Sequence, residues 1–184
     1  MDIFRDEQDY LNFLRRLRIA LGKSQGATSS IRLTPFDPSF FSLIAYCLMP
    51  NHFHFQIKQC GEVPLGKLLL KVCTSYSMYF NKKYDHVGHV FQDQFKAVPI
   101  QTDGQAIALS AYIHQNPKVA RFADAPEQWA YSSYQDYIGS RHGNLIDPSF
   151  ILTQFTDRKA YKAFVDESFE DILEYKNIGK LILD

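Results

Sequence analysis

The sequence predicts an α+β fold in which helices interrupt a mainly antiparallel sheet. One observation is a segment, FFSLIAYCLM, that is apolar at nearly every position, and a second is HFHFQIKQ, which follows after only Pro50 and Asn51. So short a connection joins antiparallel neighbours, because parallel strands need a long crossover. The third observation is the helical spacing of apolar residues before and after these segments. This order of elements favours α+β over a doubly wound sheet.

The composition limits the possible classes of protein. The chain has 184 residues, with 20 basic and 20 acidic side chains, so any attraction for nucleic acid must come from a local basic patch. Its three cysteines form no C-x-x-C pair and indicate reduced thiols. We see no signal peptide and no apolar run of membrane-spanning length, and we therefore expect a cytoplasmic protein that does not contact a membrane.

Two helices are expected on either side of the paired segments. The first covers RDEQDYLNFLRRLRIALGK and ends at Gly22, and its arginines lie mostly off the apolar stripe. The second covers VPLGKLLLKVCTSYSMYFNKKY. The segment VFQDQFKAVPIQ follows as extended chain and supplies a further strand. We expect the three arginines at the surface, as candidate contacts for a charged ligand: Arg15, Arg16 and Arg18.

A third helix is expected after this strand. Thr102 and Gln105 have the spacing of a capping box, which places the start of the helix. Pro117 is expected to end it, because the residue before a proline avoids the helical region. The remaining chain, with WAYSSYQDYIG and then a helical segment DRKAYKAFVDESFEDILEY, forms a C-terminal extension.

The histidine pair of the second strand is a candidate metal site. Side chains alternate along a strand, so His52 and His54 lie on one face and Phe53 lies on the other. Two imidazoles on a rigid strand can bind one metal ion. The alternative is a pair of histidines without a shared role, and the metal interpretation needs a third ligand.

Tyr112 and Asn116 of the third helix are four residues apart and share one face of it. The Asn116 amide oxygen suits a hard cation, and the Tyr112 phenol oxygen is a potential nucleophile. The simpler interpretation is a core tyrosine and an asparagine at a helix end. On the residues alone this simpler interpretation is favoured.

Four short motifs favour the functional interpretation of these residues instead. In chain order they are MPNHFHF, GHVFQDQFK, YIHQNP and WAYSSYQDY. Over roughly residues 3–150 the chain resembles the single-tyrosine HUH transposases, and it is most similar to the REP-associated tyrosine transposases. Each motif is short, but the four in this order are highly specific.

The resemblance implies a fold and a reaction. The fold is ferredoxin-like and of the HUH type, with helices packed on a central antiparallel sheet that carries the histidines. Residues 1–124 would form the transposase or nuclease domain, and residues 125–184 would be an extension packed on it. The reaction is the cutting and rejoining of single-stranded DNA near an imperfect hairpin. By position, His52, His54 and Asn116 match the metal ligands, and Tyr112 matches the nucleophile.

The expected chemistry suits these residue types. A free phenol, with a pKa of about 10, is a weak nucleophile at neutral pH, and a phosphodiester repels attack because it is negatively charged. Mg²⁺ or Mn²⁺ held by imidazole and amide ligands would polarise the phosphate. Attack by Tyr112 would then give a covalent 5′-phosphotyrosine and release a 3′ hydroxyl.

The chain departs from the family pattern at two places. The family begins with a strand that contains a Y-H-x-x-x-R-like segment, whereas this chain starts at Met1-Asp2-Ile3-Phe4, so we expect the sheet to lack that first strand. The family's arginine in F-Q-x-R-F-K is Gln94 here. Because glutamine carries no charge, we expect a lower affinity for DNA.

The candidate DNA contacts lie at the end of the second expected helix and in the turn and extended segment that follow it. They are mostly basic, and the resemblance places them near the site: Lys82, Lys83, His86, His89, Gln94 and Lys96. A plain solvated face is the alternative. Tyr131, Tyr134 and Tyr137 have rings that stack on bases, but packing of the extension is the favoured role.

Two further functions compete with an active transposase. The first is a domesticated or truncated relative that binds hairpin DNA without cleaving it, which the missing strand and Gln94 favour. The second is an unrelated metal hydrolase, which no H-E-x-x-H-like motif supports. The expected partner is single-stranded or hairpin DNA, the expected state is a monomer or homodimer, and the resemblance implies a bacterial, nucleoid-associated location.

Overall fold

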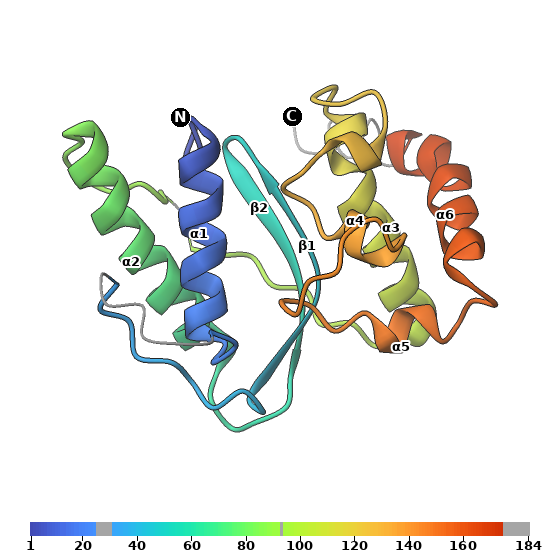
Figure 1. Cartoon of the computed structure of the whole chain (residues 1–184), viewed down its shortest axis with the longest axis horizontal. Coiled ribbons are helices and arrows are strands. Elements are labelled where there is room, and N and C mark those ends of the chain that lie inside the picture. The colour runs from blue at the N-terminus through green and yellow to red at the C-terminus, as the bar shows by residue number, and fades with distance from the viewer. Residues whose placement is uncertain (25–30, 93, 175–184) are drawn as a thin grey trace. The chain divides into compact units, whose positions relative to one another are not determined.

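The computed structural model describes residues 1–24, 31–92 and 94–174. Part of the expected loop at 25–30, Asp93 of the GHVFQDQFK motif, and the end of the extension at 175–184 lie outside the described residues. Figure 1 shows the elements, which are α1 (Glu7–Ala20), β1 (Phe41–Met49), β2 (His52–Gln59), α2 (Leu65–Tyr84), α3 (Asp103–Val119), η1 (Pro126–Gln128), α4 (Tyr134–Tyr137), α5 (Ser149–Leu152) and α6 (Arg158–Glu167).

The chain divides into two compact units, which interleave in sequence. The first unit comprises residues 1–42, 50–52 and 57–98, and the second comprises residues 43–49, 53–56 and 99–184. The division at residue 124, with a separate extension, stays a prediction.

The hairpin of β1 and β2 confirms the α+β class and the two paired segments. The two strands form a hairpin (Figure 1) with Pro50 and Asn51 in its turn. Strand β1 is buried along almost its whole length, as a continuous apolar run predicts. The further strand expected in VFQDQFKAVPIQ is wrong, because the described residues of that segment contain no strand. Residues 94–101 are all exposed, so they have no apolar face to bury, and Pro99 lacks an N–H for a ladder.

In the first unit, α1 lies beside α2 (Figure 1), and aromatic side chains contact one another between the two helices. Asp6 caps α1 and forms a capping box with Asp9. Rings of Phe4, Phe13 and Tyr76 contact one another with centroids 5.2–5.5 Å apart. These rings form the centre of the unit's core, since all three are buried.

Arg16 corrects the expectation that the α1 arginines lie at the surface. Its side chain is buried, and its Nε donates to the Ser75 carbonyl and hydroxyl, 3.1 Å from each. The aliphatic stem covers apolar surface while the guanidinium finds acceptors, which a sequence pattern cannot reveal. Arg16 is therefore a structural residue and no longer a candidate DNA contact.

In the second unit, α3 begins where the sequence predicts and ends later. Thr102 caps it, and the predicted capping box with Gln105 is present. The expectation that Pro117 ends the helix is wrong, because the helix continues to Val119. A proline here removes the bond to the carbonyl four residues earlier and crowds that carbonyl, and the burial of Asn116 and Pro117 offsets this cost.

The rest of the second unit packs on α3 and pairs with β1. Helices α5 and α6 contact α3. Residues 131–133 run beside β1: the Leu48 N–H donates to the Tyr131 carbonyl, and the Ser133 N–H donates to the Tyr46 carbonyl, each at 2.9 Å. An isolated antiparallel bridge joins Cys47 and Ser132. This short pairing gives β1 hydrogen-bond partners along one edge.

Tyr134 and Tyr137 are fully buried in this unit. The Tyr137 hydroxyl donates to the Ile44 carbonyl at 3.1 Å. A buried ring cannot stack on a base, so the packing role is confirmed for these two tyrosines and the base-stacking alternative is wrong. Tyr131 remains half-exposed.

Cys47, Cys60 and Cys73 are free thiols, as expected. In the part of the chain that the structure describes, no helix has the length and apolar character needed to cross a membrane.

Candidate active site

Tyr112 lies on α3 in the second unit and is half-exposed, while Ala111 before it and residues 113–117 after it are buried. The buried residues hold the helix, so the position of the tyrosine is fixed by its neighbours. Its side chain still reaches solvent, which a nucleophile needs. The Tyr112 phenol is thus accessible to a ligand and is held by a rigid helix.

His54 faces Tyr112 within the same unit. The two rings meet edge to face, with centroids 5.7 Å apart and planes at 82°. Phe53 and Phe55 contact each other with centroids 4.7 Å apart, which shows the alternation of β2. The imidazole that the sequence singles out therefore lies beside the tyrosine that it singles out.

Asn116 follows Tyr112 by one helical turn and is buried. Its Nδ2 donates to the Tyr112 carbonyl at 2.9 Å. This bond fixes the orientation of the amide, so that Oδ1 is directed away from the helix backbone. An amide oxygen in that orientation is the end that accepts a proton donor or binds a hard cation.

His52 begins β2 and lies in the first unit, exposed to solvent. Its Nδ1 is 2.6 Å from Oδ1 of Asn51. Because an amide oxygen only accepts, Nδ1 must carry the proton and Nε2 must hold the lone pair. Asn51 thus sets the tautomer in which Nε2 of His52 can bind a metal.

The structure brings together His54, Tyr112 and Asn116 in the second unit. The convergence of His52 with them stays a prediction. Within the described ranges, no three side chains of His, Cys, Asp or Glu gather closely enough for a metal. A metal at the predicted site would therefore depend on an amide oxygen, from Asn116, as its third protein ligand.

Four of the six candidate DNA contacts are exposed in the first unit, and His86 is half-exposed: Lys82, His89, Gln94 and Lys96 are the exposed ones. Lys83 differs, because its ammonium lies 2.6 Å from Asp6 and 2.8 Å from Asp9. Partial desolvation lowers the pKa of Lys83, but the hydrogen bonds to these carboxylates outweigh it and raise the pKa above the ordinary lysine value. The charge of Lys83 is largely neutralised within the protein.

Sequence reasoning missed the role of His114, which lies two residues after Tyr112. His114 is fully buried, with Nδ1 2.7 Å from the Tyr161 hydroxyl and Nε2 2.8 Å from the Ser133 hydroxyl. The Tyr161 hydroxyl donates to Ser110 at 3.0 Å, so it accepts from Nδ1–H, and Nε2 accepts from Ser133. Burial, helped by the charge of Arg141, lowers the pKa of His114 to about 3.

His114 is therefore a neutral crosslink between α3, α6 and the segment that pairs with β1. Unlike His54, His114 is not a candidate for the active site, because it is fully buried and both of its ring nitrogens are hydrogen-bonded. Its position in the YIHQNP motif was the only available signal, and that signal did not distinguish a structural histidine from a ligand.

A comparison with protein families decides the relationship. Residues 36–116 match the family described as "Transposase IS200 like". Over this segment the chain is similar to the IS200-like transposases. The match begins before β1 and ends at Asn116, so it includes both histidines of β2, Tyr112 and Asn116. No curated protein and no solved structure matches the chain significantly.

The match to the IS200-like transposases confirms the resemblance to the single-tyrosine transposases and supports a transposase-like, DNA-binding function. The similarity to the REP-associated subgroup stays a prediction. Within the matched segment, the contact between His54 and Tyr112 places an imidazole beside a phenol on a rigid helix.

Proposed function

We propose that this protein cuts and rejoins single-stranded DNA beside a hairpin, with Tyr112 as the nucleophile. The observation that carries the proposal is the edge-to-face contact of Tyr112 with His54, 5.7 Å between ring centroids, with the Asn116 amide one turn further along α3. The family match over residues 36–116 supports DNA as the substrate.

The reaction is a transesterification that keeps the number of phosphate ester bonds constant. The Tyr112 oxygen attacks phosphorus, a bond forms from this oxygen to the 5′ phosphate, and the bond from phosphorus to the 3′ oxygen breaks. The phenol proton is lost, and the departing 3′ oxygen gains a proton, so the products are a phosphotyrosine and a 3′ hydroxyl. The same 3′ hydroxyl, or one on another strand, reverses the step without ATP.

The residues present fit a divalent ion, which would be Mg²⁺ or Mn²⁺. The donors would be Nε2 of His52, a ring nitrogen of His54 and Oδ1 of Asn116, and this mixture of imidazole and oxygen suits these cations. Such an ion, when bound, supplies positive charge that neutralises the phosphate and the charge that develops on it. Asn51 supports the fit, because it holds His52 in the tautomer that a ligand needs.

The rest of the machinery is positional. The Asn116 amide bonds to the Tyr112 carbonyl, and the buried residues around them keep both side chains on one face of α3. Holding the attacking oxygen in place removes much of the entropic cost of bringing it to phosphorus. A tyrosine on a helix is better suited to this than one on a loop.

The test is the formation of a covalent protein–DNA adduct. The full chain is incubated with a 3′-labelled single strand that carries a hairpin, in Mn²⁺ or Mg²⁺, and the adduct is mapped by peptide mass spectrometry. We expect attachment at Tyr112 through a 5′ phosphate. Tyr112→Phe keeps the ring and its packing, so folding and DNA binding should persist while the adduct disappears.

Tyr131→Phe is the matched control, because Tyr131 is also half-exposed in the second unit and should keep full adduct formation. Attachment at any other tyrosine overturns the assignment of Tyr112. Binding of the hairpin by the folded, metal-loaded protein without any adduct favours the alternative, a relative that binds hairpin DNA and does not cleave it.

A further inference from the structure

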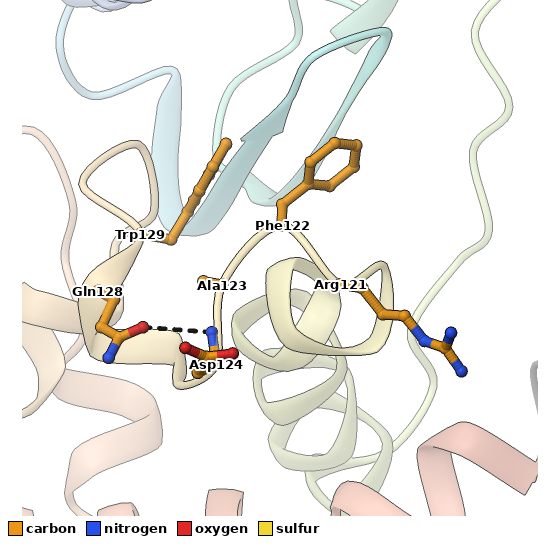
Figure 2. Close-up of a pocket in the computed structure, with 6 residues that line it drawn as sticks. All are labelled: Arg121, Phe122, Ala123, Asp124, Gln128 and Trp129. Atoms are coloured by element: carbon orange, nitrogen blue, oxygen red, sulfur yellow. Dashed lines mark hydrogen bonds between the residues drawn. The ribbon is translucent and has the colours of Figure 1, made fainter.

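The loop that follows α3 forms a hollow of about 400 Å³ on the second unit. It is lined by Arg121, Phe122, Ala123, Asp124, Gln128 and Trp129 (Figure 2). The helix that carries Tyr112 and Asn116 ends at Val119, so this loop continues directly from the candidate nucleophile. From Tyr112 to the helix end is about 10.5 Å along the axis, at about 1.5 Å per residue.

Arg121 occupies a backbone position that glycine normally fills. Its φ is 63°, in the left-handed region, just after the helix C-cap Ala120. The Phe122 N–H donates to the Pro117 carbonyl at 2.8 Å, and the Arg121 N–H donates to the Lys118 carbonyl at 2.9 Å, which completes the helix end. Glycine would satisfy both bonds without strain, so the cap alone does not explain an arginine.

The Arg121 side chain is available to a ligand. It is exposed, and among the described residues its guanidinium makes no ion pair with a carboxylate. In Figure 2 it points away from the rings of Phe122 and Trp129. A bound molecule that reaches both the Arg121 guanidinium and these rings would therefore be extended, with an anionic part and a flat part.

Phe122, the next residue after Arg121, presents a flat apolar surface. The ring is 51% exposed, and its centroid lies 6.0 Å from Trp129, with the planes at 40°. The position of Trp129 is fixed by two contacts. Its Nε1 donates to the Leu48 carbonyl at 2.9 Å, and its ring meets the Tyr131 ring in a T-shaped contact with centroids 5.6 Å apart. An exposed aromatic ring supported by a fixed one is the arrangement that stacks on a nucleobase.

The polar residues of the hollow can hydrogen-bond to a base. The Asp124 N–H donates to Oε1 of Gln128 at 3.2 Å, so the Gln128 amide keeps its NH₂ as a donor (Figure 2). The exposed Asp124 carboxylate accepts from an exocyclic amine, as cytosine N4 offers and thymine does not. This carboxylate also disfavours a bare anion near it in the hollow.

We propose that this hollow binds one nucleotide of the single strand on which Tyr112 acts, with its base stacked on Phe122 and its phosphate at Arg121. The proposal rests on the proposed function for its substrate class. It adds a recognition site for unpaired DNA within a few nucleotides of the scissile phosphate, with a preference for a base that carries an amino group.

The experiment uses the fluorescence of Trp129, the single tryptophan of the chain. The full chain is titrated with dC12 and with dT12 while emission is recorded, and total binding is followed by anisotropy of a labelled strand. We expect dC12 to quench Trp129 and to bind more tightly than dT12. Phe122→Ala should weaken binding by about 5- to 100-fold, the range for loss of one stacked base.

Arg121→Gly removes the guanidinium while it relieves the backbone strain, so the protein should stay at least as stable and bind dC12 about 5-fold or more weakly. Asp124→Asn should abolish the preference for dC12 over dT12. The controls are Phe150→Ala and Arg32→Gly, exposed residues elsewhere that should leave both readouts unchanged.

The outcomes separate the two proposals. Quenching with an adduct at Tyr112 supports both, and quenching without an adduct supports the hollow and overturns the proposed cleavage. An adduct without quenching, or with unchanged affinity in Phe122→Ala, overturns the hollow alone, and absence of both signals overturns both. Saturation by dCMP at the concentrations at which dC12 saturates would show a site for free nucleotides and would overturn the strand contact.

Discussion

At the scale of single residues, the histidine pair depends on side chains that are not ligands. The short contact from Nδ1 of His52 to Oδ1 of Asn51, at 2.6 Å, leaves Nε2 as the nitrogen with a lone pair. The sequence shows Asn51 only as a turn residue before the strand. Its second role follows from the contact, because a metal-binding imidazole is oriented by the partner of its other nitrogen.

Asn51→Ala should therefore weaken metal binding without removing a ligand. We expect the affinity for Mn²⁺, measured by isothermal titration calorimetry on the full chain, to fall by about 10- to 100-fold. Asn51→Asp keeps an acceptor for Nδ1–H and should retain most of the affinity. If Asn51→Ala binds Mn²⁺ as the parent does, Asn51 serves only the turn.

His114 makes the stability of the fold depend on pH. Its pKa is about 3 in the folded protein because it is buried, against 6.5 as the reference value, so the unfolded chain binds more protons between these values. Stability is therefore fully present above pH 6.5 and is lost as the pH falls toward 3. At pH 5 this group alone should cost about 2 kcal/mol relative to pH 8, at ~1.4 kcal/mol per pH unit.

Urea unfolding between pH 8 and pH 4.5 measures this loss, with the exposed residue changed in His89→Gln as a control that should keep the slope. In the NMR spectrum, the His114 ring protons should not titrate above pH 4.5 in the folded protein. A ring that titrates near pH 6.5 would show that the buried network with Tyr161 and Ser133 does not form.

At the scale of elements, Lys83 joins α1 and α2. Asp9 on α1 has no exposed side-chain surface and accepts from Lys83 at 2.8 Å and from the hydroxyls of Tyr79 and Tyr84, all on α2. Hydrogen bonds from Lys83, Tyr84, Tyr79 and the Arg5 N–H outweigh burial and lower the pKa of Asp9. This carboxylate stays ionised because α2 supplies its partners.

Lys83→Glu should thus destabilise the protein by about 2–4 kcal/mol, because a buried carboxylate loses its cation and meets a second negative charge. Lys82→Glu, one residue away and exposed, is the matched control and should change stability by less than about 0.5 kcal/mol. Chemical unfolding of both variants measures the difference. Equal stabilities would mean that the contacts of Lys83 contribute no more than an ordinary surface ion pair.

The start of helix α3 could be predicted from local sequence, but its end could not. Its start was predictable, since Thr102 and Gln105 interact only with each other and the local backbone. Its end was not, because the local preference against a helical residue before Pro117 is smaller than the packing gained by burying Asn116 and Pro117. Lys118 and Val119, which continue the helix beyond Pro117, carry the chain to Arg121 and the hollow of the proposed nucleotide site.

At the scale of the whole molecule, the sequence predicts what is local or periodic. The hairpin follows from two apolar runs and a two-residue turn, and the candidate nucleophile follows from motif order. The sequence could not place Arg16, whose acceptor Ser75 lies 59 residues away, or the partner of β1 at Tyr131–Ser133. It also could not show that residues 94–101 lack a buried face. Each of these depends on contacts between distant segments.

The charge of the whole chain sets the last prediction. Its net charge is zero, so DNA binding must depend on local cations, and Lys82 and Lys96 are exposed while Lys83 is neutralised by aspartates. Lys82→Glu combined with Lys96→Glu should weaken binding of a hairpin with single-stranded flanks. Two lost phosphate contacts should also reduce the slope of log affinity against log salt by about 1.4, at ~0.7 per contact with a single strand.

Fluorescence anisotropy at several salt concentrations measures both quantities. Lys159→Glu combined with Lys67→Glu, which makes the same charge change at two other exposed lysines, should weaken binding at low salt through the overall charge but leave the salt slope nearly unchanged. A general electrostatic effect would lower the affinity of both double variants equally. A contact with phosphate would appear as a slope that falls in the Lys82 and Lys96 pair alone, and equal slopes in the two pairs would show that this surface is only solvated.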